Sequence, residues 1–232
     1  MTWDIGKTLD LVEARFGRSQ RMLANASIQS TSQRLRYAHF HYHQLVDELD
    51  AYRKELGDRL VIDAAFGQNK DVQQAYYAFM ERVGAHAVAS VQSIHAVADL
   101  LAASVFMSLN LSAKSKAVAE HDITFRLTLD RLATDSKNST IESTLRGLMA
   151  DAGFKHVNAL SNKAKHSSIV QPVLNEDFTG LRGKRLEVQF QEFERKGVRY
   201  PQGSIADVLG PAYNLASKTV VDVGKEMIKV LT

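Results

Sequence analysis

The chain has 232 residues, of which 45% are hydrophobic and 24% charged, a balance that is ordinary for a soluble globular protein. It contains no cysteine, which excludes disulfides, thiolate metal sites and thiol nucleophiles. Its net charge of +3 permits a nucleic-acid partner without requiring one, because an electrostatic binder usually shows clustered Lys and Arg. Residues 1–10 show no basic region followed by an apolar segment, so we expect no signal peptide and a cytoplasmic protein.

Apolar residues recur with helical spacing through the first 170 residues, where no proline occurs. The pattern predicts helices over 2–24, 31–57, 71–109 and 113–135, a short apolar segment at 60–66, a helix opening at Ser139–Thr140, and, beyond Gly153, a helix over 154–167. Residues 85–111 are apolar enough to be considered as a membrane span. Asp99 alone would cost about 2.5–3.5 kcal/mol at the centre of a bilayer. We therefore interpret this segment as a buried helix and expect no membrane partner.

The pattern changes after Pro172. Residues 185–191 alternate between apolar and polar side chains, as a half-buried strand does, and Lys196–Gly197 is a turn signal before a possible partner strand at 198–200. A final helix is predicted from 205 to 231, with a break at Gly210–Pro211.

The sequence thus predicts an all-α fold, a helical bundle with a small antiparallel β-hairpin inserted before the C-terminal helix. We expect one domain over 1–232, in which the N-terminal helices of 1–66 pack on a bundle formed by 71–231.

Polar residues gather on one side of the helix predicted over 154–167. Val157, Leu160, Ser161 and Ala164 fall on a plausible core face, and beside it runs a stripe of Lys155, Asn158, Asn162, Lys165 and His166, called here the polar stripe. Its lysines would attract a phosphate, its amides would orient it, and His166 could exchange a proton near neutral pH. The alternative interpretation is an ordinary solvated helix surface.

The segment Ser161-Asn-Lys-Ala-Lys-His166 resembles the active-site motif of the HEPN-superfamily RNases. That motif is an Arg, a polar residue that is often Asn, three further residues and a His. Asn162 and His166 match it, and Ser161 stands where the family has its Arg. The resemblance implies an all-helical, RNA-directed protein, in a phage-defence or toxin–antitoxin setting, that forms a homodimer with the motif helices near the two-fold axis.

Within that resemblance, Asn162 and His166 are the candidate catalytic residues of a metal-independent RNase without a cofactor. Because Ser161 lacks a guanidinium fork and lysine offers only a point charge, we expect RNA cleavage to be weak or absent while binding persists. The protein would then be a degenerate RNA-binding relative. A second hypothesis stays open, in which the long helices form a non-catalytic module that binds a protein partner or self-associates.

Two histidine groups add further candidates. His95 and Asp99, four residues apart, are secondary binding residues, because HEPN sites often recruit a polar residue from another helix; a satisfied polar pair inside the bundle is the alternative. In His39-Phe-His41-Tyr-His43, only the outer two histidines share a helix face. Two imidazoles are too few for zinc unless Asp47 supplies a third ligand, so we expect no metal site.

Overall fold

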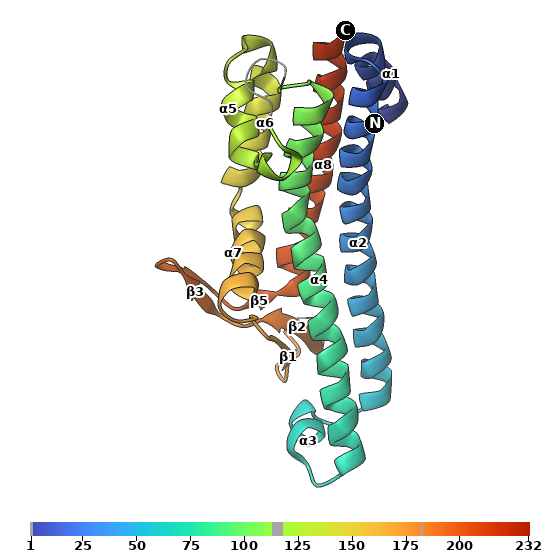
Figure 1. Ribbon diagram of the computed structural model, residues 1–232. Coiled ribbons are helices and arrows are strands. Elements are labelled where there is room, and N and C mark those ends of the chain that lie inside the picture. Colours follow the sequence, from blue (N-terminus) through green and yellow to red (C-terminus); the bar gives the residue numbers. More distant parts are fainter. Residues whose placement is uncertain (1, 113–117, 182) are drawn as a thin grey trace. The chain divides into compact units, whose positions relative to one another are not determined.

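The computed structural model describes residues 2–112, 118–181 and 183–232 (Figure 1). Over these residues the α-helices are α1 Ile5–Phe16, α2 Arg18–Leu56, α3 Val61–Phe66, α4 Lys70–Ser108, α5 Phe125–Leu132, α6 Ser139–Ala150, α7 Ala152–His166 and α8 Ile205–Leu231. Two short 3-10 helices are η1 Glu120–Asp122 and η2 Ser136–Asn138, and the strands are β1 Pro172–Glu176, β2 Leu186–Phe190, β3 Phe193–Arg195, β4 Val198–Tyr200 and β5 Gly203–Ser204. The predicted fold class, helical with a small antiparallel sheet before the last helix, is confirmed.

The break between the first two helices lies at Gly17, so the prediction of a break near residues 25–30 was wrong. Gly17 has a φ of 88°, and its N–H closes α1 on the carbonyl of Glu13. The hydroxyls of Ser30 and Thr31 donate to the carbonyls of Ala26 and Ser27 one turn earlier. These residues are therefore accommodated inside α2 instead of capping a new helix.

Two further helix boundaries differ from the prediction. Residues 113–117 of the helix predicted over 113–135 lie outside the described residues, and the described remainder forms η1 and α5. Thr124 begins α5 as its N-cap, accepting the N–H of Leu127. The predicted break at Pro211 was wrong, because α8 continues through this proline, which only removes one donor from the main-chain ladder.

The strands pair differently from the predicted hairpin. Lys196 and Gly197 both have positive φ, 51° and 75°, which is the backbone of a two-residue hairpin turn and forces the immediately flanking residues together. β3 and β4 therefore form their own two-stranded sheet, with Phe193 opposite Tyr200. The strand predicted at 185–191 is β2, which pairs with β1 and with β5 in the antiparallel order β1–β2–β5.

Contacts divide the chain into two compact units, and each boundary falls inside a helix. The first unit is Met1–Arg36, Ser93–Lys155 and Ala212–Thr232, and the second is Tyr37–Gln92 and His156–Pro211. Buried core side chains of the first include Val12, Ile28, Leu101, Leu132 and Val223, and those of the second Phe79, Val83, Val157, Phe190 and Leu209. The predicted single domain stays a prediction.

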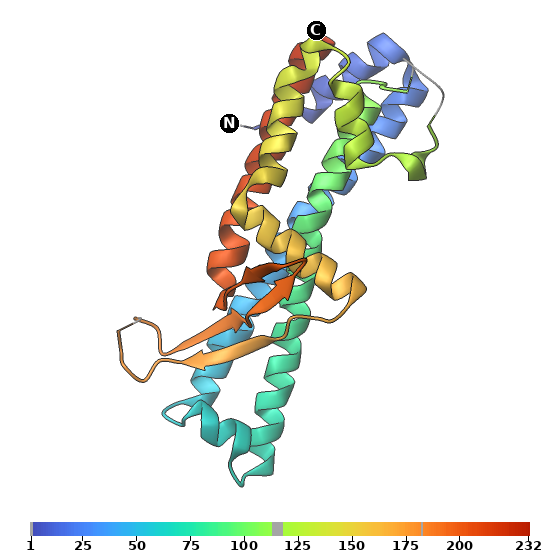
Figure 2. The same cartoon turned by 90° about the vertical axis from the view of Figure 1, so that its left-hand side faces the viewer.

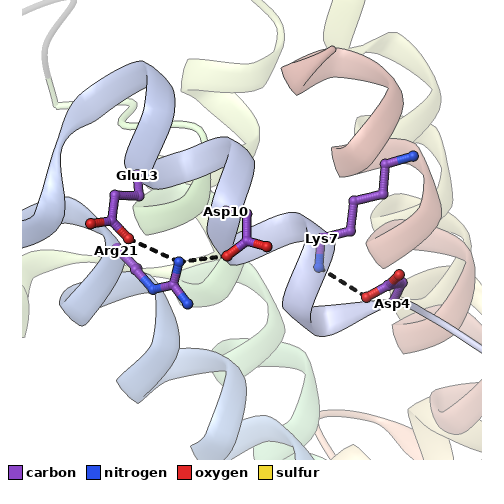
Figure 3. A network of polar contacts seen from close by, with 5 residues as sticks. All are labelled: Asp4, Lys7, Asp10, Glu13 and Arg21. Atoms are coloured by element: carbon purple, nitrogen blue, oxygen red, sulfur yellow. Dashed lines mark hydrogen bonds and ion pairs between the residues drawn. The ribbon is translucent and has the colours of Figure 1, made fainter.

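In the first unit, α1 is fixed on the start of α2 by a surface network (Figure 3). The Arg21 guanidinium lies 2.7 Å from a carboxylate oxygen of Asp10 and 2.9 Å from one of Glu13. Asp4 caps α1 by accepting the backbone N–H of Lys7. Exposed pairs of this kind contribute little to stability because water and salt screen them, so the buried core contributes more than this network.

In the second unit, the later part of α2 and the earlier part of α4 run side by side and are joined through α3 (Figures 1 and 2). Tyr52 and Phe79 stack between them with ring centres 4.1 Å apart. The sheet is tied to the α2–α3 connection by Glu176, whose side chain is 4% exposed, pairs with Arg185 and accepts the N–H of Val61. Arg185 also donates to the carbonyls of Gly57 and Arg59.

One helix of the described residues, α4, is long and apolar enough to cross a membrane. Of its most apolar stretch, 56% is buried inside the structure. A buried core helix passes the same test of length and composition, so this is weak evidence for a membrane span.

Candidate functional site

The sequence provides hydrogen-bonding groups that close α7 at both of its ends. Asp151 accepts the N–H of Phe154 through its side chain and so caps the N-terminus. At the other end, the N–H groups of Ser167 and Ser168 close on the carbonyl of Lys163. Basic residues in the last turn, Lys163, Lys165 and His166, complement the negative end of the helix dipole. Lys165, which makes a phosphate site plausible, therefore also stabilises α7.

The polar stripe lies at the surface of α7. Lys155, Lys165 and His166 are exposed, whereas Asn158 and Asn162 are half-buried. The side-chain amide of Asn162 donates to the backbone carbonyl of Asn158 at 2.9 Å and to its side-chain oxygen, so the two asparagines act together. Lys155 is the last residue of its segment in the first unit, and the other four belong to the second.

Ser161 occupies the core face, as its position on the helix predicted. It is 0% exposed, and its hydroxyl has no hydrogen-bond partner in the described structure. A buried hydroxyl without a partner costs on the order of 1–3 kcal/mol. The residue that aligns with the family's Arg is thus packed in the interior, whereas Lys165 and His166 are exposed.

The secondary candidates His95 and Asp99 both lie on α4 in the first unit. His95 is half-buried and Asp99 is exposed. Because the motif residues Asn162 and His166 belong to the second unit, a joint site of the two groups stays a prediction.

The three histidines of α2 take part in two separate pairs within the second unit. His39 and His43 are exposed, with their Nε2 atoms 3.0 Å apart. His41 faces α4 instead, and its Nδ1 lies 3.0 Å from the Nδ1 of His86. Burial, followed by the nearby His86, lowers the pKa of His41. Among the residues that the structure describes, no group of three or more His, Asp or Glu could hold a metal ion.

Sequence reasoning missed His156, which lies on α7 next to Lys155. Its ring packs against Phe193 and Tyr200, with ring centres 5.7 and 5.0 Å away, and these two aromatic rings stack on one another at 4.8 Å. Its Nε2 is buried without a partner in the described structure, and burial lowers its pKa. His156 is therefore neutral at pH 7 and adds packing, not charge, to this surface.

A small cavity lies between α4, α7 and the sheet. Its lining includes Val88, Leu160, Ala164 and Phe190, and it holds about 10 Å³. That is scarcely the volume of one water molecule, far below the several hundred Å³ of a ligand pocket. A ligand of α7 would therefore bind to its exposed polar groups and not inside this cavity.

Comparison of the chain with protein-family models, with curated proteins and with solved structures gives no match.

Proposed function

We propose that this protein binds single-stranded RNA through the polar stripe without cleaving it, as a degenerate relative of HEPN-like RNA-directed bundles. One observation carries the proposal: Lys165 and His166 are exposed at the end of α7, while Ser161, in place of the catalytic Arg, is fully buried. The lysine that attracts a phosphate is accessible, and the guanidinium that would stabilise a transition state is absent.

The chemistry of RNA cleavage explains why this protein would bind RNA without cleaving it. Attack of a ribose hydroxyl on the adjacent phosphate needs a proton acceptor and a cation held beside the developing charge. His166 can serve as the acceptor. Lys165 is a flexible point charge without the bidentate geometry of an arginine, so it attracts the phosphate without fixing it. A homodimer and a phage-defence or toxin–antitoxin setting belong to the same proposal and rest on the motif resemblance. A cytoplasmic location is proposed with them and rests on the sequence pattern alone.

Fluorescence polarisation with a labelled single-stranded RNA, in the presence of a chelator, tests the proposal. Lys165→Ala should raise Kd about fivefold and reduce the slope of log K against log salt by about 0.7, the loss of one phosphate contact. The matched control is Lys7→Ala, which removes the same charge from an exposed position on α1 (Figure 3). Equal effects of the two substitutions, or no RNA binding by the wild type, would refute the RNA-binding proposal.

A second candidate function is a non-catalytic interaction module. It is favoured by apolar side chains at the α3 end of the second unit: Ile62 is 59% exposed, Phe66 76% and Tyr77 55%. Exposed apolar side chains grouped in this way often mark an interaction surface. Light scattering at tens of micromolar protein should then give a dimer that Phe66→Ser dissociates, while RNA binding stays absent.

A further inference from the structure

His39 and His43 lie one turn apart on the exposed side of α2, and their Nε2 atoms approach to 3.0 Å. Two imidazoles at positions i and i+4 of a helix share one face, a spacing that recurs in helical metal sites. In this chain the pair is accessible to solvent, so an ion could reach it without a change in the fold.

The two histidine pairs have the same nitrogen separation but different orientations. In His41–His86 the ring centres are 5.3 Å apart, whereas in His39–His43 they are 4.1 Å apart. For a fixed distance between nitrogens, the ring centres are farthest apart when the nitrogens meet head-on. The His41–His86 pair thus has the geometry of a direct N–H···N hydrogen bond. The His39–His43 rings meet more obliquely, although this contact too is a hydrogen bond, whose proton an ion bridging the two nitrogens would displace.

The number and kind of ligands indicate the class of metal. With bonds of about 2.0–2.1 Å, two nitrogens on one ion lie about 2.9–3.3 Å apart, a range that includes the 3.0 Å between His39 and His43. Zn²⁺ usually takes three or four protein ligands, whereas nitrogen ligands bind Cu²⁺ most tightly and tetragonal sites suit Cu²⁺ and Ni²⁺.

We propose that His39 and His43 chelate one divalent transition-metal ion of tetragonal preference, Cu²⁺ or Ni²⁺, through their Nε2 atoms, with water in the remaining positions. This site lies on α2 and is independent of the RNA proposal for α7. Asp47 is exposed one turn beyond His43 but forms no three-ligand cluster with the pair among the described residues. Two protein ligands and open positions therefore define the site.

Titration calorimetry with Ni²⁺ on the full chain, stripped with a chelator, tests the site. Wild type should bind one ion. His39→Ala and His43→Ala should each weaken binding about tenfold or more, because losing a ligand should cost at least as much affinity as losing a group that only hydrogen-bonds to a ligand. The matched control is His86→Ala, which removes one imidazole from the other 3.0 Å pair and should change affinity less than about twofold. Asp47→Asn should also leave binding unchanged.

A second measurement identifies the ligands directly. The electron paramagnetic resonance spectrum of the Cu²⁺ complex should show coupling to two imidazole nitrogens in the wild type and to one in His39→Ala. Both side chains are exposed, so the variants should keep the wild-type circular dichroism. No Ni²⁺ binding by the wild type, equal binding by His39→Ala, or loss of binding in His86→Ala instead would each overturn the proposal.

Discussion

The side-chain amide of Asn162 donates one turn back along α7 to both oxygens of Asn158, the backbone carbonyl and the side-chain oxygen. The donor of Asn162 is thus already used within the helix, and its role is to hold Asn158 in one orientation. The accessible charge of the polar stripe belongs instead to the exposed Lys155 and Lys165.

The first prediction follows from this division of roles. Asn162→Ala should raise the Kd for single-stranded RNA about twofold, because it removes the amide that orients the side chain of Asn158, but it should leave the salt slope of binding unchanged, since no charge is removed. Polarisation titrations at two salt concentrations check this. A change in slope as large as that of Lys165→Ala would contradict the assignment.

The second prediction concerns Ser161. Ser161→Arg places a guanidinium in a fully buried position and should lower the free energy of unfolding by about 3–5 kcal/mol, through uncompensated charge and overpacking. It should therefore fail to create an RNase, although it restores the family's motif in the sequence. Urea unfolding and an RNA cleavage assay measure the two effects.

Ser161→Ala is the matched control for that substitution. It removes a hydroxyl that has no partner in the described structure, so its free energy of unfolding should lie within about 1 kcal/mol of wild type, on the stabilising side. A large loss of stability in Ser161→Ala would indicate that the hydroxyl has an important partner.

The sequence predicts best what depends on local periodicity. Helical spacing places Ser161 on the core side of α7, and a period of two identifies β2. Prediction from the sequence fails where contacts between distant segments determine the structure. Ser30 and Thr31 look like a helix start, yet Thr31 is buried inside α2 with its hydroxyl 3.0 Å from that of Ser104 on α4, 73 residues away. The partner of His41 is His86, 45 residues away, a pairing that no local pattern encodes.

The third prediction uses the buried His156. Its pKa in the folded protein is lowered by burial, so in acid the unfolded state binds the proton more readily. The contribution of neutral His156 to the free energy of unfolding is fully present above the unfolded-state pKa of about 6.5. It is lost as the pH falls below that value. Between about pH 7.5 and 5, wild type should lose more unfolding free energy than His156→Phe, which keeps the ring packing against Phe193 and Tyr200. Parallel losses in the two proteins would show that His156 does not titrate on unfolding.

The fourth prediction concerns the first unit, where Trp3 lies directly on Gly224 of α8. A Cβ at residue 224 would overlap the indole ring, whereas a Cβ at the exposed Gly147 of α6 would meet nothing within 4 Å. Gly224→Ala should therefore lower the free energy of unfolding by about 1–3 kcal/mol, and the control Gly147→Ala should raise it by about 0.5–1 kcal/mol through helix propensity. Trp3 is the single tryptophan and donates to Thr8 at 2.8 Å. Its fluorescence should shift to longer wavelength in Gly224→Ala, because the displaced indole enters water, and stay unchanged in the control.

An unshifted spectrum with unchanged stability in Gly224→Ala would show that the indole does not pack on α8.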